Sequence, residues 1–461
     1  MTDWTPDLTA TGKPRYLAIA DSIAADIAAG RLTAGDRLPP QRALAQRLGM
    51  DFTTIARGYV EAQKRGLVDA RVGQGTFVRA AAAASAPPAR RRASEPVDLT
   101  MNLPPEVDDP ELLARMAGGI EALRADLVPL LRYQGFGGQP ADKAAAGLWL
   151  ARRGLAPAAD RLFITPGAHA ALMAILTQLA KPGDTILCEA LTYPGLRALA
   201  AQLSLTLVGL PMDAAGIDPQ AFRAAATRLK PKALYLTPTL QNPTTRTVPP
   251  ARRADIVAVA RDLGVPLIED DAYGFIPPDG PLPLAALAPD LTWYVASLAK
   301  CLGAGLRCAY VVAPEARAAW PFAATMRATT VMASPLTVAL ATHWIEDGTG
   351  DALLSFIRSE TALRQEMARA LLPAGSFEAD PLSFHLWLPL PAPWTRAAFI
   401  GHLRATGLGV VASDAFATTP QAPEAVRLCI GGPISRDALR GALTFLSHAL
   451  TETPAIASTF L

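Results

Sequence analysis

Residues 297 to 310, SLAKCLGAGLRCAY, set Lys300 among small residues and return Arg307 seven positions later, at the edge of an apolar run. A lone lysine in such a place is normally a surface side chain. An arginine at this spacing, however, can hold a phosphate group that positions a cofactor over the lysine amine. The pair therefore predicts a nucleophilic lysine served by a phosphate-binding arginine.

Acidic residues close the apolar run of IEDDAYGF, residues 268 to 275. Carboxylates at the carboxyl end of a strand lie where open α/β sheets bind ligands. Asp270 can pair with the nitrogen of a pyridine ring and keep it protonated, so that the ring accepts electrons. Tyr273, three residues later, can then donate to a hydroxyl of the same ring. We expect Asp271, in contrast, to be a solvated loop acid.

Two further segments follow apolar runs in the same way. In LTPTLQNPTT, residues 236 to 245, the amide of Asn242 can donate to the same ring hydroxyl, although Asn-Pro alone is a common turn. In ITPGAHAAL, residues 164 to 172, a glycine turn opens a helix whose free N–H groups suit a phosphate. An ordinary strand-to-helix turn is the alternative for that segment.

Apolar, β-rich runs alternate with alanine-rich helical segments after residue 98, and these elements would position the side chains above. Such alternation predicts an α/β domain with a mostly parallel sheet covered by helices on both faces. From about residue 350 the segments fit a smaller α+β subdomain. The runs expected as strands are LFIT near 162, TILCEA near 185, LTLVGL near 205, ALYLT near 233, VPLIED near 265, TWYVAS near 292 and CAYVVA near 308.

Taken in this order, the four segments resemble those of fold-type-I pyridoxal-phosphate enzymes, the aspartate aminotransferase superfamily, over roughly residues 98 to 461. The resemblance implies pyridoxal 5'-phosphate as the cofactor, held by Lys300 as the internal aldimine. It implies that Asp270 binds the pyridine nitrogen and that Asn242 and Tyr273 bind the ring oxygen. The phosphate ligands that it implies are Gly167, Ala168, His169, Ser297 and Arg307.

The resemblance implies three further site residues. Tyr193, in ALTYPGL, matches the aromatic residue that stacks on the ring face, with a buried core tyrosine as the alternative. Arg427, in VRLCIGG, matches the arginine that clamps the carboxylate of an amino acid, a bidentate role that lysine could not fill. An isolated strand arginine is more usually a salt-bridged surface residue. Tyr133 matches a tyrosine that reaches the partner subunit's phosphate.

Two segments depart from the pattern of the superfamily. The segment RYQGFGGQPADKAA keeps Tyr133 but lacks the usual Leu-Arg downstream, where Asp142 and Lys143 stand instead. The segment MNLPP, residues 101 to 105, takes the place where many relatives supply a glycine beside the substrate carboxylate. We therefore expect the scope of amino compounds to differ from that of relatives.

The first 79 residues have the pattern of a different, smaller unit. Apolar residues between positions 16 and 27 recur at helical spacing, and Gly30 can end that helix. A second short helix ends at Gly49, and a third begins with Thr53 as the expected N-cap. Two short strands about the Gly-Gln-Gly turn of LVDARVGQGTFV follow. Three helices and a two-stranded wing predict a winged helix-turn-helix.

Basic residues give this unit a net charge of +3, from eleven Lys or Arg against eight Asp or Glu. Phosphate contacts need only a few such side chains on one face, and the start of the recognition helix contacts bases. A protein-docking module with solvated arginines is the alternative that charge alone allows. The candidate DNA-contacting residues are Arg37, Arg42, Thr53, Thr54, Arg57, Arg71 and Gln74.

The stretch GDRLPPQRALAQRLGMDFTTIARGYVEAQKRGLVDARVGQGTFV resembles the GntR family of bacterial transcription regulators, which implies binding to double-stranded DNA. That family usually has a Ser-Arg pair at the start of the recognition helix, where this chain has Asp51 and Phe52. The operator sequence is therefore not transferable from relatives.

Residues 80 to 97 combine an alanine run, paired prolines and three adjacent arginines, which is typical of a linker. The predicted domains are therefore a DNA-binding unit at 1–79, a linker at 80–97, and an aminotransferase-like unit at 98–461. A length of 461 residues agrees with more than one domain.

Bulk composition excludes several other classes of protein. The net charge of +2 gives the whole chain no dominant electrostatic partner. Neither a secretory signal nor a transmembrane segment is expected, so we place the chain in the cytoplasm. The four cysteines lack CxxC pairing and the five histidines are scattered, so we expect reduced, mostly buried thiols and no metal site.

A GntR-type winged helix joined by a linker to an aminotransferase-like domain is the arrangement of the MocR subfamily of transcription regulators. The resemblance implies a homodimer, and we expect it to sense a small amino compound through aldimine exchange at Lys300. A working aminotransferase of an α-amino acid with a 2-oxo acid is the competing reading. A regulator that responds to the cofactor itself is a third. The effector, the operator and the direction of regulation stay open.

Overall fold

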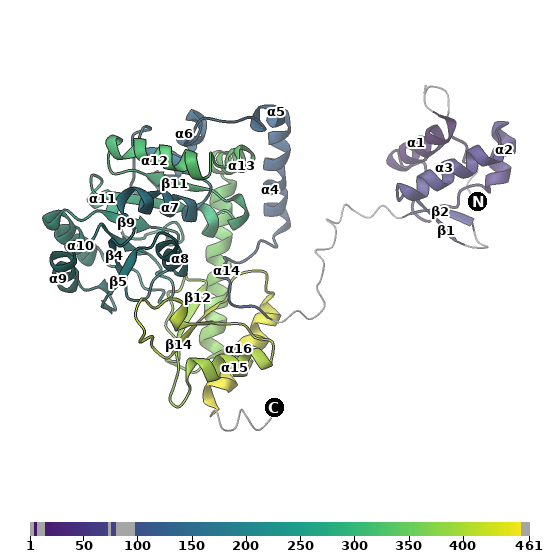
Figure 1. Ribbon diagram of the computed structural model, residues 1–461. Coiled ribbons are helices and arrows are strands. Elements are labelled where there is room, and N and C mark those ends of the chain that lie inside the picture. Colours follow the sequence, from purple (N-terminus) through teal and green to yellow (C-terminus); the bar gives the residue numbers. More distant parts are fainter. Residues whose placement is uncertain (1–3, 7–13, 72–74, 80–96, 453–461) are drawn as a thin grey trace. The chain divides into compact units, whose positions relative to one another are not determined.

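The structure, a computed structural model, describes residues 4–6, 14–71, 75–79 and 97–452 (Figure 1). The chain divides into two compact units, Met1–Ser94 and Glu95–Leu461. Apart from Val97, the predicted linker lies outside the described residues, so the domain boundaries stay a prediction. Within the described ranges, no helix is both long enough and apolar enough to cross a membrane.

The described residues of the smaller unit form three helices and an antiparallel two-stranded wing, as predicted. Its elements are α1 (Arg15–Ala28), α2 (Gln41–Leu48), α3 (Phe52–Lys64), β1 (Val68–Arg71) and β2 (Gly75–Val78). The apolar faces of the helices meet in one core, where Ile19, Leu44 and Ile55 are buried. Gly49 ends α2 with a φ of 61°, a left-handed conformation that glycine adopts without a steric penalty.

The start of α3 differs from the sequence expectation. The N-cap is Asp51, whose carboxylate accepts hydrogen bonds from the backbone N–H groups of Thr53, at 2.9 Å, and Thr54, at 3.3 Å. Thr53, which we expected as the N-cap, is instead the second residue of the helix. An aspartate stabilises the first turn both by these bonds and by its charge at the positive end of the helix dipole.

The larger unit is built on a seven-stranded sheet of order β3-β11-β10-β9-β8-β4-β5. All neighbouring strands are parallel except β11, which runs antiparallel to both β10 and β3, so the predicted mostly parallel sheet is confirmed. The strands are β3 (Leu162–Thr165), β4 (Thr185–Glu189), β5 (Thr206–Leu210), β8 (Ala233–Leu236), β9 (Leu267–Asp270), β10 (Thr292–Ser297) and β11 (Ala309–Val312). Each of the seven runs expected as a strand is one of them.

Helices cover both faces of this sheet (Figure 1), which explains why its strands read as continuous apolar runs. Alternate residues of β10 face opposite sides, because side chains alternate along a strand. Trp293 and Val295 join the core beneath α7 and α12, whereas Tyr294 and Ala296 join the core beneath α6 and α13. The helices of this unit up to residue 346 are α4 (Pro110–Ala122), α5 (Leu127–Leu130), α6 (Pro140–Ala151), α7 (Ala168–Leu179), α8 (Pro194–Gln202), α9 (Pro219–Leu229), α10 (Pro250–Leu263), α11 (Leu284–Leu287), α12 (Ala316–Thr329) and α13 (Pro335–Glu346).

A smaller subdomain follows the long helix α14 (Thr349–Leu371), as predicted. Its antiparallel sheet, of order β12-β14-β13, packs against α15 and α16 around a separate core. Residues 97–105 also belong here, since Asp98 bridges to Gly409 and Pro105 bridges to Gly432. The elements are β12 (His385–Pro389), α15 (Arg396–Ala405), β13 (Val411–Ala412), β14 (Ala425–Cys429) and α16 (Arg436–Thr451).

Short elements complete the larger unit. The four cysteines are unpaired and buried, as the sequence indicates. The short elements are the 3-10 turns η1 (Leu123–Asp126), η2 (Leu298–Lys300), η3 (Ala304–Leu306) and η4 (Ser413–Ala415), and the hairpin of β6 (Met212–Asp213) with β7 (Gly216–Ile217).

Candidate functional site

Lys300 lies at the carboxyl edge of the large sheet, in the 3-10 turn η2 that follows β10 directly. Its Nζ atom donates a hydrogen bond to the backbone carbonyl of Asn102. Burial, helped by the nearby cation of Arg427, lowers the pKa of Lys300 to about 8 against the opposing effects of Cys429 and Asp270. The amine is therefore far closer to neutral at physiological pH than an exposed lysine.

Asp270 is the last residue of β9 and is buried. One carboxylate oxygen, Oδ2, accepts a hydrogen bond of 2.8 Å from the hydroxyl of Tyr235. Among the described residues, the other oxygen, Oδ1, has no hydrogen-bond partner. Burial raises the pKa of Asp270 to about 6, and the Tyr235 bond and Lys300 oppose that rise. A buried, unpaired carboxylate oxygen fits the protonated nitrogen of a pyridine ring.

Two contacts of residues 100–102 gather the other predicted residues beside Lys300: Asn102 bonds to Tyr273, and Thr100 bonds to Arg427, which also contacts Asn242. The side-chain amide of Asn102 donates to the hydroxyl of Tyr273 at 2.9 Å. Arg427 donates to the side-chain oxygen of Asn242 at 3.3 Å and to the backbone carbonyl of Thr100. Because Asn242 accepts through its oxygen, its NH₂ group remains as the donor.

Arg427 is only 4% exposed, in the middle of β14, so it is not the surface residue that an isolated strand arginine usually is. Its guanidinium lies 5.4 Å from the ring centre of Phe416, and its Nε has no hydrogen-bond partner among the described residues. No described carboxylate forms an ion pair with Arg427. A buried cation of this kind can bind an incoming carboxylate.

The predicted phosphate ligands lie where β3 turns into α7. Gly167 has a φ of 94°, and a Cβ atom on it would lie 3.0 Å from Nη2 of Arg307, so the guanidinium rests against this glycine. Ala168 and His169 begin α7, and no side chain caps their N–H groups. Burial and Arg307 lower the pKa of His169. Free N–H groups beside an arginine fit a phosphate.

The remaining predicted residues have more varied surroundings. Ser297 caps the η2 turn by accepting from the backbone N–H of Ala299 at 3.3 Å. Tyr193 is half-buried and precedes α8, and burial together with Asp270 raises its pKa. Tyr133 is 85% exposed, and among the described residues no hydrogen bond or ring contact joins it to the Lys300 site.

Asp271 corrects a sequence expectation, because it is fully buried and not a solvated loop acid. Its carboxylate accepts from Arg153 at 3.0 Å and from the hydroxyl of Tyr294 at 2.8 Å. Arg153 and Tyr294, which are far apart in sequence, thus hold the Asp271 carboxylate. This carboxylate lies on the opposite side of the sheet from that of Asp270.

Sequence reasoning missed three polar residues of the site: Asn102, Tyr235 and His385. The segment MNLPP drew attention to residues 101–105 but gave no sign that Asn102 contacts both Lys300 and Tyr273. His385 is buried, with its ring nitrogens 3.0 Å from the hydroxyl of Ser383 and 3.3 Å from the carbonyl of Gln241. Burial, helped by Arg427, lowers the pKa of His385 to about 3, so its ring is neutral.

The candidate DNA contacts lie on α2, α3, the wing and the loop before α2. Thr53 and Arg57 are exposed on α3, whereas Thr54 is partly buried. The guanidinium of Arg57 lies 4.5 Å from the ring centre of Tyr16, and that of Arg42 lies 5.9 Å from the ring centre of Phe52. Arg37 is exposed and bridges to Phe77 of the wing. Arg71 ends β1, and Gln74 lies outside the described residues.

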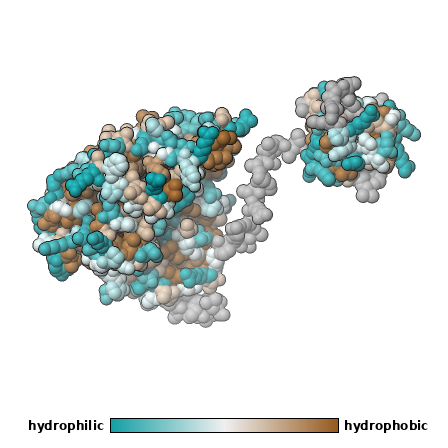
Figure 2. Space-filling model, turned by 45° about the horizontal axis from the view of Figure 1, so that its top comes forward, coloured by the Kyte–Doolittle hydropathy of each residue, from teal (hydrophilic) through white to brown (hydrophobic). Residues whose placement is uncertain are grey.

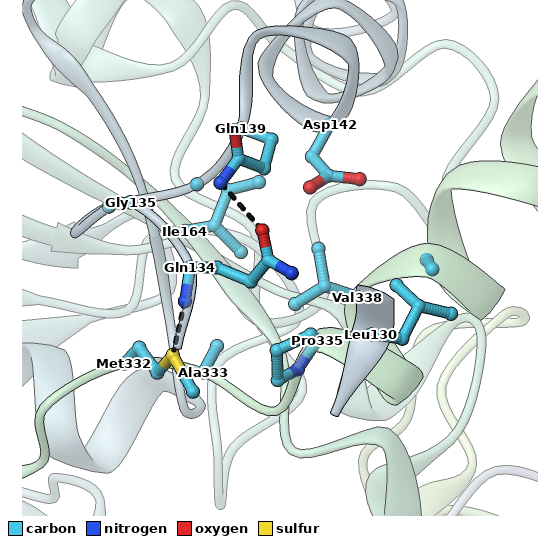
Figure 3. A pocket seen from close by; sticks show the side chains of 13 residues that line it. Leu130, Gln134, Gly135, Gln139, Asp142, Ile164, Met332, Ala333, Pro335 and Val338 are labelled. Atoms are coloured by element: carbon cyan, nitrogen blue, oxygen red, sulfur yellow. Dashed lines mark hydrogen bonds between the residues drawn. The ribbon is translucent and has the colours of Figure 1, made fainter. Parts of the chain in front are cut away.

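A separate cavity lies away from Lys300, between α5, the start of α6, β3 and the start of α13 (Figure 3). Its lining is mostly apolar, including Leu130, Ile164 and Val338. Gln139 donates to Gln134 across one side at 2.7 Å, as Figure 3 shows. Among the described residues, no group of acids, histidines or cysteines could hold a metal ion in this or any other place.

Comparison with known families gives two matches. The family described as aminotransferase class I and II matches residues 99–444, and the family described as bacterial regulatory proteins, gntR family, matches residues 15–78. Relatives include the uncharacterized HTH-type transcriptional regulator YdeF of Bacillus subtilis, 29% identical over 97% of each chain. The HTH-type transcriptional regulator TauR of Rhodobacter capsulatus is 28% identical over 83% of this chain and 85% of its own.

Another relative is the HTH-type pyridoxine biosynthesis transcriptional regulator PdxR of Corynebacterium glutamicum, 29% identical over 63% of this chain and 64% of its own. Among solved structures, the α-aminoadipate aminotransferase LysN of Thermus thermophilus superposes with a TM-score of 0.70 at 21% identity, over 79% of this chain and 93% of that one. The chain therefore belongs to the class I and II aminotransferase family and, with a gntR-family DNA-binding domain before it, has the architecture of MocR-type transcriptional regulators.

Proposed function

We propose that the aminotransferase-like unit is the sensor of this regulator and that it reads a small amino compound at Lys300. Membership of the class I and II aminotransferase family makes pyridoxal phosphate the cofactor. The observation that carries the proposal is the convergence of Lys300, Asp270 and Arg427 on one site in a chain that also has a gntR-family domain. A nucleophile, a ring partner and a carboxylate partner are the groups that an amino-acid receptor of this kind needs.

The residues present fit the cofactor. We assign Asp270 to the ring nitrogen, Asn242 and Tyr273 to the ring oxygen, and the ring of Tyr193 to the face of the cofactor. Bound there, pyridoxal phosphate supplies a carbonyl carbon that amines attack and a ring that withdraws electrons. The phosphate is assigned to Gly167, Ala168, His169, Ser297 and Arg307.

Lys300 acts as the nucleophile that holds the cofactor. Another amine can take the place of the Lys300 amine on the cofactor. With a pKa of about 8, roughly a quarter of its amine is neutral at pH 7.5, whereas an ordinary lysine is almost entirely charged. A neutral amine is required both to attack a carbonyl carbon and to leave as a free amine. Burial of Lys300 therefore favours reversible exchange with an effector.

Arg427 makes a carboxylate the expected second group of the effector. The buried guanidinium has an unpaired Nε atom and rests on Phe416. A carboxylate would supply the charge that this cation lacks and could bind two of its N–H groups at once. An amine and a carboxylate together define an amino acid or a close analogue.

In the smaller unit, we assign Thr53, Thr54 and Arg57 to the DNA bases and Arg37, Arg42 and Arg71 to the phosphates, with Gln74 as a further wing contact. The exposed start of α3 and the basic residues beside it support this assignment. Phosphate contacts position such a helix, and its first residues read the sequence.

We also propose that the chain works as a homodimer through the side of the larger unit that carries α4 and α5. Figure 2 shows hydrophobic side chains at the surface near this edge. Large exposed apolar patches mark interaction surfaces. Tyr133 belongs to the same surface, and we assign it to the partner subunit's phosphate. The exposed apolar residues are Leu113, Ile120, Leu127, Val128, Leu131, Tyr133 and Phe136.

A second candidate follows from the name of one relative, PdxR, a regulator of pyridoxine biosynthesis. A regulator that responds to pyridoxal phosphate itself would need Lys300 and Asp270 but not Arg427. A working aminotransferase is the remaining alternative, and it requires turnover with a 2-oxo acid.

The substitution Lys300→Ala tests the proposal. The variant should keep measurable affinity for promoter DNA but lose every change in that affinity when amino acids are added, because no amine is left to exchange. The substitution Arg427→Ala separates the candidates: it should abolish the response to amino acids and leave a response to pyridoxal phosphate. A full amino-acid response in Lys300→Ala would sink the idea of sensing at this lysine.

A further inference from the structure

Residues 97–105 form the leading segment of the larger unit, since they are the first described residues after the stretch that joins it to the DNA-binding unit. Backbone hydrogen bonds fix this segment to the smaller subdomain. The N–H of Leu99 donates to Gly409 at 3.0 Å, the N–H of Cys429 donates to Leu99 at 2.9 Å, and that of Gly432 donates to Pro104 at 2.9 Å. The leading segment is thus an ordered wall of the site.

Two carbonyls of the leading segment contact the two residues that would bind an amino acid. The carbonyl of Thr100 accepts from Arg427, and the carbonyl of Asn102 accepts from Nζ of Lys300. The chain bends at Met101, where the N–H of Leu103 donates to the Met101 carbonyl at 3.0 Å, so the carbonyls on either side of the bend both reach the site. The leading segment therefore touches both ends of the expected effector position.

The side chain of Asn102 fixes the position of that residue's own backbone carbonyl. Its side-chain amide donates to the hydroxyl of Tyr273 at 2.9 Å and lies 3.3 Å from Nδ1 of His385. The Asn102 side chain is buried, whereas its neighbour Met101 is 62% exposed. The side chain of Asn102 therefore ties the backbone of the leading segment to the site.

We propose that Asn102 positions Lys300 and Tyr273, and that the leading segment reports effector occupancy to the chain that leads to the DNA-binding unit. The proposal rests on the proposed function. While the nitrogen of Lys300 is bonded to the cofactor carbon, the carbonyl of Asn102 lacks its donor and Arg427 holds Thr100. Once an effector replaces Lys300 on the cofactor carbon and binds Arg427, the carbonyl of Thr100 loses its hydrogen bond from Arg427. The carbonyl of Asn102 then regains its hydrogen bond from Lys300, so the leading segment is held at Asn102 in place of Thr100.

The exchange step balances without any further reagent. The effector nitrogen forms the bond to the cofactor carbon, and the bond from that carbon to Nζ of Lys300 breaks. The two hydrogens of the effector amine end on Lys300, which leaves as a free primary amine able to donate to Asn102. An effector shifts the segment only because it binds these two arrangements with different affinity.

Two amine reagents distinguish the contact of Lys300 with Asn102 from the contact of Arg427 with Thr100, in the full chain loaded with pyridoxal phosphate. Both reagents displace Lys300 from the cofactor carbon. Methoxyamine has no carboxylate, whereas aminooxyacetate has a carboxylate that can bind Arg427. The visible band reports release of Lys300, and amide hydrogen exchange of residues 97–105 reports the segment.

With methoxyamine, exchange in residues 97–105 should slow about threefold or more, because the carbonyl of Asn102 gains a donor while Arg427 still holds Thr100. With aminooxyacetate, peptides that end before Met101 should exchange faster than with methoxyamine, and peptides that begin after it should exchange alike. The two reagents thus distinguish the contact of Lys300 from that of Arg427.

Asn102→Ala and Met101→Ala are the matched variants, since they change neighbouring residues of which only Asn102 contacts the site. Each is measured at a reagent concentration that saturates its own band shift. The methoxyamine effect should be lost in Asn102→Ala and retained in Met101→Ala.

Unchanged exchange in the wild-type chain despite a complete band shift would overturn the proposal and leave amine exchange at Lys300 standing. A full effect in Asn102→Ala would overturn the positioning role of that residue. No band shift with either reagent would overturn both this proposal and the proposed function.

Discussion

Tyr235 and Asp270 are joined by a hydrogen bond of 2.8 Å from the tyrosine hydroxyl to one carboxylate oxygen, while the other oxygen has no partner among the described residues. Both residues are buried on adjacent strands of the sheet. The bond fixes the orientation of the carboxylate, so that its unpaired oxygen is presented to the ring nitrogen that we assign to it.

Removing that hydroxyl should weaken cofactor binding. We expect Tyr235→Phe to lower the affinity of the apoprotein for pyridoxal phosphate about tenfold, because a hydrogen bond to a charged group contributes about 1.5–3 kcal/mol. Equilibrium dialysis measures this directly. Tyr294→Phe is the control, since the Tyr294 hydroxyl bonds to Asp271 at the same distance of 2.8 Å. Equal affinities for Tyr235→Phe and wild type would contradict the orienting role.

The burial of Asp270 should cost the apoprotein stability. Its pKa is higher in the folded chain, at about 6, than the ordinary value of 3.8, so the folded state binds more protons across this window and stability falls as pH rises through it. At pH 7.5, Asp270→Asn should therefore stabilise the apoprotein by roughly 1–3 kcal/mol. The gain should vanish by about pH 3, below the ordinary pKa of 3.8, where the carboxyl is protonated in both states.

Denaturant unfolding of the two apoproteins at both pH values measures this difference. Asp270→Asn should also bind pyridoxal phosphate more weakly than wild type. A less stable Asp270→Asn apoprotein at pH 7.5 would show that the carboxylate is well solvated or paired, contrary to the structure.

The rate of cofactor attachment should depend on pH through Lys300. Because the pKa of this lysine is lowered to about 8, the fraction of neutral amine rises as pH increases and levels off above that value. Stopped-flow absorbance of apoprotein mixed with pyridoxal phosphate should give a rate that is half-maximal near pH 8. A rate still rising steeply at pH 9.5 would mean that the amine is not perturbed.

DNA binding should depend on Arg42 through phosphate contacts. Arg42→Ala should weaken binding to any duplex DNA several-fold and reduce the slope of log affinity against log salt by about 0.9. Arg65→Ala, directly after α3, is a matched control, because Arg65 already pairs with Asp21 at 2.6 Å and Glu61 at 2.9 Å. Fluorescence anisotropy at several salt concentrations measures both. Equal salt slopes for Arg42→Ala and wild type would remove Arg42 from the interface.

The sheet and the winged helix could be predicted because their signals are local. Continuous apolar runs mark strands that are buried on both faces, and Gly49 marks a helix end. The order of Gly167, Asn242, Asp270 and Lys300 behind such runs indicated one common edge. Gly167, Asn242 and Lys300 do follow strands of the large sheet and Asp270 is the last residue of one, although their contacts with the cofactor remain predictions.

What the sequence did not predict depends on contacts between distant segments. Asp271 is adjacent to Asp270, and the positions of Arg153, 118 residues away, and Tyr294, 23 residues away, explain its burial. Asn102 contacts Lys300 from 198 residues away, which no local pattern could indicate. The N-cap of α3 was assigned two residues late because Asp51 and Thr53 are both good capping residues and only the backbone distinguishes them.

The most direct test of sensing at Lys300 is the visible absorption of the full-length protein during titration with a panel of amino acids, with DNA affinity measured on the same samples. The account predicts a yellow protein whose band shifts reversibly with one amino acid, then stays constant, while DNA affinity changes with the same midpoint. Conversion to the colourless pyridoxamine form, reversed by a 2-oxo acid and without effect on DNA binding, would contradict it and indicate a working aminotransferase.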